Sequence, residues 1–473
     1  MADVIVVGGG TSGFAAAVAA ARAGAKVLLL EQSSYLGGTI TGGLVPGLVS
    51  MRHQPWRDEE TLVQLESLYS GDQVVRGIAQ EFVDRMIKAD GAFGRLGEAS
   101  VRILFDPEIA KWVIESMVKD AGVEVHYYSK VIGVTKKGDA VSGVVVNYNE
   151  SIPGKVVVDA TGDGNVCYLA GARYEQGEAG NPVLVQPISL YFVLGAVQID
   201  KTIQYIESRP EDFSVGYIQK LKELRRQNKP FTIIALPALR EQAIKNGDYP
   251  VPYGVPEVNP KAHLSIFRPV FRGGKVCYDM TMHNVDMAFK VDATSIAQLS
   301  DALVAMRDFT VKMARFFRKY VPGFEESFLL QVADMVGVRE TRRIIGDYVL
   351  TGEDVLEART FGDSIGYCGA TVDIHNVEGA REKTRMEAIK AGGSYQIPYR
   401  ILLPVGLENL LTAGRCVSAD RVACGSIRQQ AGCLVTGQAA GAAAALAAMK
   451  GIPPRSVPAG ELQEILRGQG VIL

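Results

Sequence analysis

The sequence feature that most constrains the fold is a glycine-rich turn near the start of the chain, Gly8-Gly9-Gly10-Thr11-Ser12-Gly13. Apolar runs at 3–7, 14–23 and 26–30 surround it and predict a strand, a helix and a second strand, which together form a βαβ unit. In such a unit the first glycine permits the tight turn, the second lets a pyrophosphate approach the backbone, and the third allows close packing of the helix on the strand. The helix N-terminus adds unpaired N–H groups and a positive dipole end. We therefore expect an α/β protein that binds a dinucleotide through Gly8, Gly10, Thr11, Ser12 and Gly13.

Glu31 stands just after the second expected strand, 18 residues beyond Gly13. A carboxylate at this place can accept hydrogen bonds from the ribose hydroxyl groups of a dinucleotide. Because Glu31 is not a neutral residue followed by arginine, the 2′-phosphorylated ribose of NADP is disfavoured. Glu31, with Gln32 beside it, is therefore predicted to contact the ribose of FAD or of NAD.

The order of the following segments favours FAD over NAD. An NAD-dependent dehydrogenase usually continues with further βαβ units, whereas this chain leaves the nucleotide fold after Glu31 and returns to it late. Runs at 123–128, 129–135 and 140–147 predict the strands of a small antiparallel sheet. A strand at 155–159 then leads into Ala160-Thr161-Gly162, and a late strand ends at Gly414-Arg415 before a helix at 434–449. The nucleotide-binding domain is therefore expected to be discontinuous.

A family resemblance is carried by these features together with the segments 76–82, 337–348, 395–400 and 413–441. Over nearly its full length the chain resembles the FAD-dependent oxidoreductases of the glutathione-reductase type, beside the fumarate-reductase-like and glucose-inhibited-division-like flavoproteins. The resemblance implies FAD, a Rossmann-type FAD-binding domain with a parallel sheet and a small antiparallel sheet, and an inserted α+β substrate domain. It also implies that the helix at 434–449 directs its N-terminus at the pyrimidine edge of the flavin. The cofactor contacts that it implies are Gly37, Gly38, Thr39, Val131, Ala160, Thr161, Gly162, Gly414, Arg415, Gln430, Gly432 and Cys433.

The domain boundaries expected from this pattern divide the chain into three parts. Residues 1–170 form the first part of the FAD-binding domain, with a helical insertion at about 50–100. Residues 171–394 form a substrate domain or cap, and residues 395–473 return to the FAD-binding domain and end it with a C-terminal helix. Two helices are expected within 59–88.

Candidate catalytic residues come from three segments that should lie near the flavin. Arg339 and Arg343 can bind a carboxylate through their guanidinium groups, although a salt-bridged surface would use them equally well. Tyr399 and Arg400 precede the strand that rejoins the FAD-binding domain, where they either face the flavin or pack a domain junction. His375 is a candidate acid or base because imidazole titrates near neutrality, and its alternative role is structural. The His and Arg set of the fumarate-reductase branch cannot be aligned, so fumarate reduction is only one option.

Composition excludes several other classes of function. The 50 basic and 52 acidic residues give a net charge of −2, without the broad positive field of a nucleic-acid-binding protein. The six cysteines contain no Cys-x-x-Cys pair, so a zinc ribbon, an iron–sulfur cluster and a dithiol centre are not predicted. The first residues carry no secretory signal. Neither of the two long apolar stretches, 14–30 and 434–449, looks like a membrane span. These observations predict a cytoplasmic protein.

The expected function is that of an FAD-dependent dehydrogenase or double-bond reductase. Hydride would pass between flavin N5 and a small polar substrate for which a carboxylate is one option. The alternative is a non-redox flavin- or NAD-binding protein, such as an RNA-modification partner or a thiazole-synthase-like scaffold. Balanced charge disfavours the first of these, and the long insertion disfavours the second. The electron acceptor or donor, covalent attachment of FAD and a homo-oligomeric state are left open.

Overall fold

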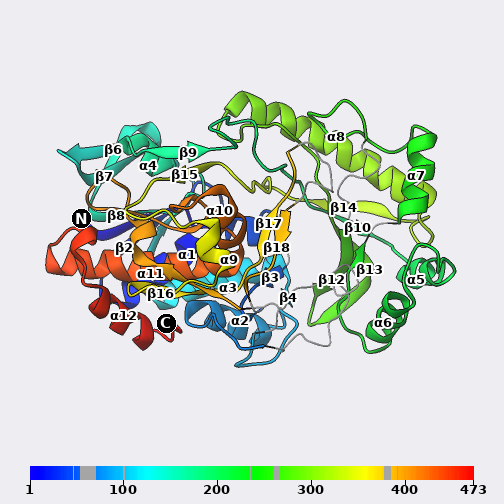
Figure 1. The fold of residues 1–473 in the computed structure, drawn as a ribbon, viewed down its shortest axis with the longest axis horizontal. Helices are drawn as coiled ribbons and strands as arrows, with labels where there is room; N and C mark the ends of the chain where they lie inside the picture. Colours follow the sequence, from blue (N-terminus) through cyan, green and yellow to red (C-terminus); the bar gives the residue numbers. More distant parts are fainter. Residues whose placement is uncertain are drawn as a thin grey trace.

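The computed structural model describes residues 1–45, 47–53, 71–99, 102–234, 236–258, 266–377, 385–390 and 393–473. Figure 1 shows two parts, one of which contains both ends of the chain while the middle of the chain forms the other. We call residues 190–336 the cap and the remainder the core domain. The expected first helix within 59–88 falls largely on residues 54–70, which lie outside the described residues.

A parallel sheet organises the core domain. Its elements are β1 (Ala2–Val7), α1 (Thr11–Arg22), β2 (Val27–Leu30), α3 (Pro107–Asp120), β5 (Glu124–His126), β8 (Glu150–Asp159) and β20 (Leu410–Thr412). Strand β1 pairs with β2 on one side and β8 on the other, while β5 adds to β2 and β20 adds to β8, all in parallel. Helix α1 connects β1 to β2, as a parallel pair requires. The Rossmann-type α/β fold predicted from the glycine-rich turn is confirmed.

A small antiparallel sheet extends the core domain. Strands β6 (Val131–Lys137) and β7 (Ala140–Val146) pair with each other, and β7 pairs with the first residues of β8. The prediction that the run at 123–128 belongs to this sheet is wrong, because β5 pairs in parallel with β2. Helix α3 lies directly before β5 and carries the chain back along the sheet, so β5 enters in the direction of β2.

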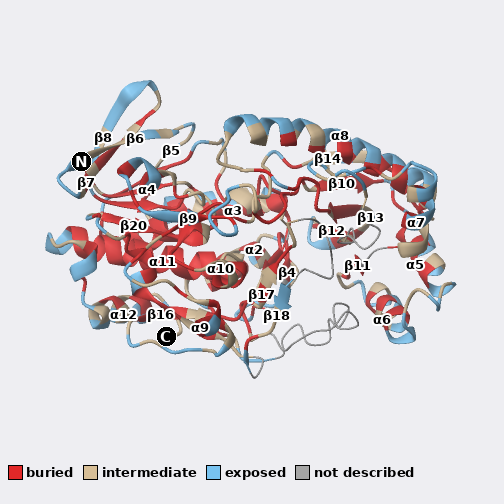
Figure 2. Cartoon of the chain, turned by 45° about the horizontal axis from the view of Figure 1, so that its top comes forward, coloured by how far each residue is buried: buried red, intermediate tan, exposed pale blue. Residues whose placement is uncertain are grey.

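Helix α11 (Gln430–Lys450) is the late helix that the sequence predicted, and it packs tightly on α1. A Cβ atom at Gly437 would lie 2.1 Å from the Ser12 carbonyl oxygen, and one at Gly441 would lie 2.0 Å from the Ala16 carbonyl oxygen. Among the described helices, α11 alone is long and apolar enough to cross a membrane, but 94% of its apolar window is buried inside the protein. Figure 2 shows α11 buried, as in the core helix of a folded domain.

The cap is a five-stranded antiparallel sheet with helices around it (Figure 1). Its elements are β10 (Phe192–Gly195), α5 (Ile199–Glu207), α6 (Val215–Arg226), β11 (Ile233–Ile234), α7 (Pro237–Lys245), β12 (Ile266–Arg272), β13 (Lys275–Asn284), α8 (Ile296–Tyr320) and β14 (Phe328–Val332). The strands lie in the order β11-β12-β13-β10-β14. One face of the sheet packs against α8, where the Phe317 ring contacts Phe267 and His283 at centroid distances of 5.5 and 4.4 Å.

Two neighbouring segments connect the cap to the core domain. The Ser189 N–H donates to the Gly337 carbonyl at 3.2 Å, and the Gly337 N–H donates to the Ser189 carbonyl at 2.8 Å. The chain therefore enters and leaves the cap as an antiparallel pair.

The core domain begins again earlier than the expected boundary at 395. Leu350, Val372 and Ile389 belong to the same hydrophobic core as β1 and α11, whereas the buried cluster of the cap ends at Ala333. The short paired strands of this region are β9 (Tyr174–Gln176) with β15 (Arg342–Ile344), β16 (Ser364–Cys368) with β19 (Tyr395–Pro398), β17 (Val372–Ile374) with β18 (Arg385–Glu387), and β3 (Gly47–Val49) with β4 (Arg102–Leu104). The remaining helices are α2 (Ile78–Lys88), α4 (Asn165–Ala170), α9 (Gly352–Leu356), α10 (Arg421–Ile427) and α12 (Ala459–Gly468).

Candidate functional site

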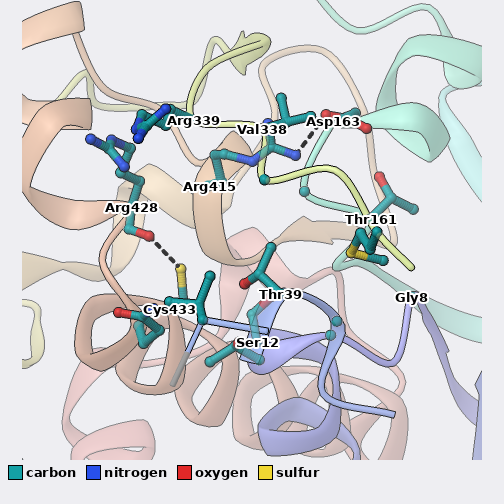
Figure 3. Close-up of a pocket in the computed structure, with 18 of the residues that line it drawn as sticks. Gly8, Ser12, Thr39, Thr161, Asp163, Val338, Arg339, Arg415, Arg428 and Cys433 are labelled. Atoms are coloured by element: carbon teal, nitrogen blue, oxygen red, sulfur yellow. Dashed lines mark hydrogen bonds and ion pairs between the residues drawn. The ribbon is translucent and has the colours of Figure 1, made fainter. Parts of the chain in front are cut away.

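A cavity of about 970 Å³ lies between the core domain and the cap. Its wall includes the turn after β1, the end of β8, the start of α11 and the cap sheet. Figure 3 shows how Gly8, Ser12 and Thr161 gather at one part of this wall, with Arg339 and Arg428 at another. The cavity is large enough for a dinucleotide with further space beyond it.

The start of α1 has the properties of a phosphate site. Gly10 precedes the helix without any side-chain cap, and the first turn contains no acidic residue. A Cβ atom at Gly10 would meet no protein atom within 4 Å, so the protein's own packing does not require glycine there. The open space over unpaired helix N–H groups fits the pyrophosphate of a dinucleotide.

Glu31 lines the cavity at the end of β2 and is held in place by three hydrogen bonds. Its Oε2 accepts from the Gly9 N–H at 2.6 Å, and its Oε1 accepts from the N–H and hydroxyl of Ser33 at 2.8 and 2.9 Å. Carboxylate oxygens can accept more than one bond each, so this fixed group can also receive ribose hydroxyls.

The predicted cofactor residues that line this cavity are Gly8, Gly10, Thr11, Ser12, Glu31, Gln32, Gly38, Thr39, Val131, Ala160, Thr161, Gly162, Arg415, Gln430 and Cys433. Four other predicted glycines, Gly13, Gly37, Gly414 and Gly432, are not in the lining. A Cβ at Gly13 would lie 1.7 Å from the Gly8 carbonyl oxygen, and one at Gly432 would lie 2.4 Å from that of Ile427. These two glycines permit close backbone packing behind the wall, which is the role predicted for Gly13.

The N-terminus of α11 faces the cavity through Gln429, Gln430 and Cys433. Burial raises the pKa of the Cys433 thiol to about 12, and this thiol donates to the Arg428 carbonyl at 3.1 Å. A thiol that stays protonated is a poor nucleophile. The unpaired N–H groups at the start of α11 can interact with a negatively charged group in the cavity.

Five alternating charged groups form a cluster at the cavity, which we call the charged cluster: Arg339, Asp286, His375, Asp373 and Arg428. The Arg339 guanidinium lies 2.9 Å from one oxygen of Asp286, and His375 Nδ1 lies 2.9 Å from the other. His375 Nε2 lies 3.4 Å from Asp373, whose second oxygen is 3.4 Å from Arg428. Arg339, His375, Asp373 and Arg428 all line the cavity.

The position of His375 between two carboxylates sets its protonation. Burial alone would lower the pKa of His375, but Asp286 and Asp373 together outweigh burial and Arg339, so this pKa lies above its ordinary value. Burial would raise the pKa of Asp373, but His375, Arg428 and Arg339 hold it well below its ordinary value. An imidazole is the one side chain whose ordinary pKa lies near neutrality, so His375 is the member of the charged cluster best suited to exchange a proton.

Three of the five expected catalytic residues are not in the cavity lining. Arg343 is buried and donates to Glu340 at 2.8 Å. The Tyr399 hydroxyl donates to the Pro454 carbonyl at 2.9 Å, and Arg400 pairs with Asp363 near the surface. The structure therefore does not bring these three side chains to the cavity that contains Arg339 and His375.

Several wall residues were missed by sequence reasoning. Arg428 and Asp373 complete the charged cluster, and Arg268 and Asn284 reach the cavity from β12 and β13. Asp373 is two residues before His375 in the sequence, and Arg428 lies in a segment that carries the family resemblance. Both could therefore have been predicted from the sequence. Arg268 carried no such signal, because its exposure to the cavity depends on which face of β12 turns inward.

The family comparison matches residues 3–466 to the model described as "FAD dependent oxidoreductase". Curated relatives include thiamine thiazole synthases from Pyrococcus furiosus, 27% identical over 173 residues, and Aeropyrum pernix, 32% identical over 164 residues. Each alignment covers 34% of this chain and 58% or 54% of the relative, so the chain spans just over half the length of these relatives.

Solved structures with a similar arrangement include a geranylgeranyl bacteriochlorophyll reductase-like protein from Thermoplasma acidophilum. It is 14% identical, with a TM-score of 0.45, over 99% of this chain and 83% of its own. A flavin-dependent brominase is 12% identical, with a TM-score of 0.44, over 99% and 84% of the two chains. The family match over nearly the whole chain is the finding that assigns it. The chain belongs to the FAD dependent oxidoreductase family, and the dinucleotide that it binds is FAD.

Proposed function

We propose that this protein transfers a hydride between FAD and a small polar substrate that carries a carboxylate, as a dehydrogenase or a double-bond reductase. The observation that carries the proposal is His375, a proton-exchanging group held between two carboxylates in the wall of a cavity that extends past the FAD residues into the cap. Family membership supports an oxidoreductase that uses FAD. The family alone does not select the reaction.

Bound FAD supplies N5 as the donor or acceptor of two electrons with a hydride. In the oxidative direction a substrate C–H bond breaks toward the cofactor, and the proton of an adjacent O–H or N–H group passes to neutral His375. In the reductive direction the carbon receives hydride and His375 donates the proton that completes the product. Either direction balances with one hydride and one proton.

The other members of the charged cluster position His375 for this role. Asp286 holds Nδ1, and its second oxygen is held by Arg339, so the imidazole ring cannot turn freely. The opposite nitrogen, Nε2, lies on the side of Asp373, which lines the cavity. We assign proton exchange to Nε2.

The first experiment tests for redox chemistry at the bound cofactor. Purified protein is expected to be yellow, to release its flavin on acid precipitation and to bleach with dithionite under anaerobic conditions. A panel of 2-hydroxy acids, amino acids and unsaturated acids is then screened for bleaching of the oxidised protein or reoxidation of the reduced protein. A panel that leaves both forms unchanged contradicts hydride transfer to these substrates.

The role of His375 is tested on any substrate found in that screen. His375→Asn is expected to lower the rate of flavin reduction and to remove the pH dependence that His375 imposes on it. His126→Asn is the matched control, because the His126 side chain is 47% exposed on β5 and is not in the cavity lining. An unchanged rate and pH profile in His375→Asn contradicts its role as the proton-exchanging group.

A second candidate is a non-redox role, favoured by the likeness to thiamine thiazole synthases over a third of the chain. It predicts that FAD binds but that no substrate in the panel changes its redox state. The bleaching screen therefore separates the two candidates.

A further inference from the structure

The cavity-facing side of the cap sheet carries polar residues on neighbouring strands. Arg268 on β12 stands opposite Met282 on β13, and Asn284 stands two positions further along β13, opposite Ile266. The intervening positions, Phe267 and His283, point to the other face, against α8. Because side chains alternate along a strand, Arg268 and Asn284 share the face that borders the cavity, and both line it.

Arg268 differs from the other arginines of the cavity wall. Arg339, Arg342, Arg415 and Arg428 each have hydrogen-bond partners within the protein, such as Asp286 for Arg339 and Asp163 for Arg415. Within the described part of the chain, Arg268 has neither a hydrogen bond nor an ion pair. Its side chain is half-buried in the wall of the cavity, so an anion that enters the cavity can pair with the guanidinium.

The pKa of Arg268 is consistent with the lack of an anionic partner for its guanidinium. Burial lowers the pKa of the Arg268 guanidinium, and the influence of Tyr191 offsets this only in part. A bound anion would reverse the effect, since it favours the charged form.

Asn284 provides a second group that lacks a partner. Its buried Oδ1 accepts no hydrogen bond from the residues that the structure describes. The two ends of an amide exchange by a half-turn of the side chain, so the same site can present the NH₂ group to an anion. Arg268 and Asn284 together then offer donors suited to the two oxygens of a carboxylate.

We propose that Arg268 and Asn284, on the cap side of the cavity, form the subsite that binds the substrate carboxylate. This inference rests on the proposed function for its substrate, and it replaces Arg339, which Asp286 already occupies, as the anion-binding arginine. The proposed subsite has one uncompensated positive charge. It therefore fits a monocarboxylate better than a phosphate ester, which would bring about two negative charges at neutral pH.

The cavity lining also includes apolar residues of the cap, among them Pro230, Phe231 and Leu299. An apolar surrounding lowers the local dielectric and strengthens the attraction between guanidinium and carboxylate. The preferred ligand is therefore a carboxylate attached to a small apolar or aromatic body.

The test measures binding to the oxidised holoenzyme, so it does not depend on turnover. Benzoate and phenylacetate are titrated while the visible flavin absorption and the melting temperature are recorded, with benzamide and benzyl alcohol as uncharged probes. We expect saturable binding of the carboxylates and weaker binding of the neutral probes. Arg268→Met is expected to weaken carboxylate binding by at least about tenfold, the value of a charged hydrogen bond of this kind.

Matched variants separate this effect from loss of charge or of folding. Arg315→Met removes an exposed arginine on α8 and is expected to change benzoate affinity by less than about twofold. Arg268→Lys keeps the charge without the planar fork and should bind between wild type and Arg268→Gln. The benzoate affinities of wild type, Arg268→Lys and Arg268→Gln can still be compared if Arg268→Met does not bind FAD.

Three results would overturn the proposal: equal benzoate affinity in wild type and Arg268→Gln, equal affinity of wild type for benzoate and benzamide, or no binding of either carboxylate. Failure of the hydride-transfer proposal has a different signature. In that case carboxylates bind and depend on Arg268, but no substrate changes the redox state of the flavin.

Discussion

Gly10 and Gly13 lie three residues apart, yet a side chain added at each position would meet different surroundings. Space over Gly10 opens into the cavity, whereas Gly13 lies against the Gly8 carbonyl of the neighbouring strand end. A glycine can thus serve a ligand or the fold, and the two roles are separable by experiment.

Gly10→Ala should therefore leave folding almost intact and weaken FAD binding, because the new methyl group meets no protein atom but occupies the phosphate space. Its backbone φ of −67° is ordinary for alanine. Gly13→Ala should destabilise the protein even without FAD, by about 1–3 kcal/mol or more, because backbone atoms must move. Melting of the apoprotein and FAD titration measure the two effects. Equal destabilisation of both apoproteins would contradict this division of roles.

His375 links the site to stability through its raised pKa. Because the folded-state pKa exceeds the unfolded value of about 6.5, its stabilising contribution is complete below that value and is lost as pH rises through the folded pKa. The contribution of Asp373 to stability depends on pH in the opposite sense, because its folded-state pKa is lowered. That contribution is lost only as the pH falls into the acidic range. The free-energy difference between wild type and His375→Asn should therefore be larger near pH 6 than near pH 9.

Urea unfolding at the two pH values measures this difference, with His126→Asn as the surface control. The control should change stability by no more than about 0.5 kcal/mol. A difference for His375→Asn that is equal at both pH values, or larger at the higher one, would show that the imidazole is not stabilised in its protonated form.

At the same scale, most of the predicted FAD contacts line the cavity, whereas only two of the five predicted catalytic residues, Arg339 and His375, do so. The glycine-rich turn and Glu31 are local signals, since their spacing along one βαβ unit determines their geometry. The pairing of Arg339 with Asp286, and of Tyr399 with Pro454, joins distant segments and leaves no local pattern. Arg268 was missed for the same reason.

At the scale of elements, the contact between α1 and α11 determines how the two separated parts of the FAD-binding domain meet. Gly437 and Gly441 bring α11 against the backbone of α1, and the N-terminus of α11 then reaches the cavity. Small residues at one-turn spacing allow this close approach, while bulkier residues would separate the helices.

Gly441→Ala should destabilise the protein by about 1–3 kcal/mol, because its Cβ would lie 2.0 Å from the Ala16 carbonyl oxygen. Gly460→Ala in α12 is the control, since a Cβ there would meet nothing within 4 Å and the change should stay within about 0.5 kcal/mol. Thermal or urea unfolding provides the comparison. A neutral Gly441→Ala would mean that the two helices can separate without cost.

Elements that a local run of residues defines were well predicted, whereas the pairing of strands was not. The expected helices at 14–23 and 434–449 overlap α1 and α11. The run at 123–128 was recognised as a strand but placed in the wrong sheet, because direction and partner depend on the crossover through α3. Buried residues between 350 and 389 belong to the core domain, although the sequence predicted a boundary at 395. Their burial against α11 and the parallel sheet depends on tertiary contacts that composition does not reveal.

At the scale of the whole molecule, the cap is a separate hydrophobic unit inserted through one antiparallel pair of segments. None of the described residues between 173 and 343 belongs to the two buried clusters that surround the parallel sheet. Of the described core-domain residues, Leu44 and Ile188 are the two that belong to the buried cluster of the cap. A small fourth cluster bridges the parts through Leu104, Phe271 and Val276. The core domain should thus contain what FAD binding requires, and the cap the residues that we propose bind the substrate carboxylate.

This division predicts the behaviour of a variant in which residues 190–336 are replaced by Asn-Gly. Ser189 and Gly337 exchange both backbone hydrogen bonds, which is the geometry that a two-residue turn closes. We expect the variant to fold and bind FAD, with lower stability because Leu104 loses its partners in the cap. It should lose the benzoate-induced change in flavin absorption, because Arg268 and Asn284 are removed.

Flavin content after gel filtration, thermal melting and benzoate titration together decide the outcome. The same deletion carrying Gly10→Ala is the control and should not retain FAD, which shows that any flavin in the parent variant occupies the site over α1. If the deletion variant binds FAD and still responds to benzoate, the carboxylate subsite lies in the core domain, where Arg339 and Arg428 still line the cavity. If it cannot fold with FAD, the small bridging cluster contributes more to the core domain than its size implies, and cap and core form one cooperative unit.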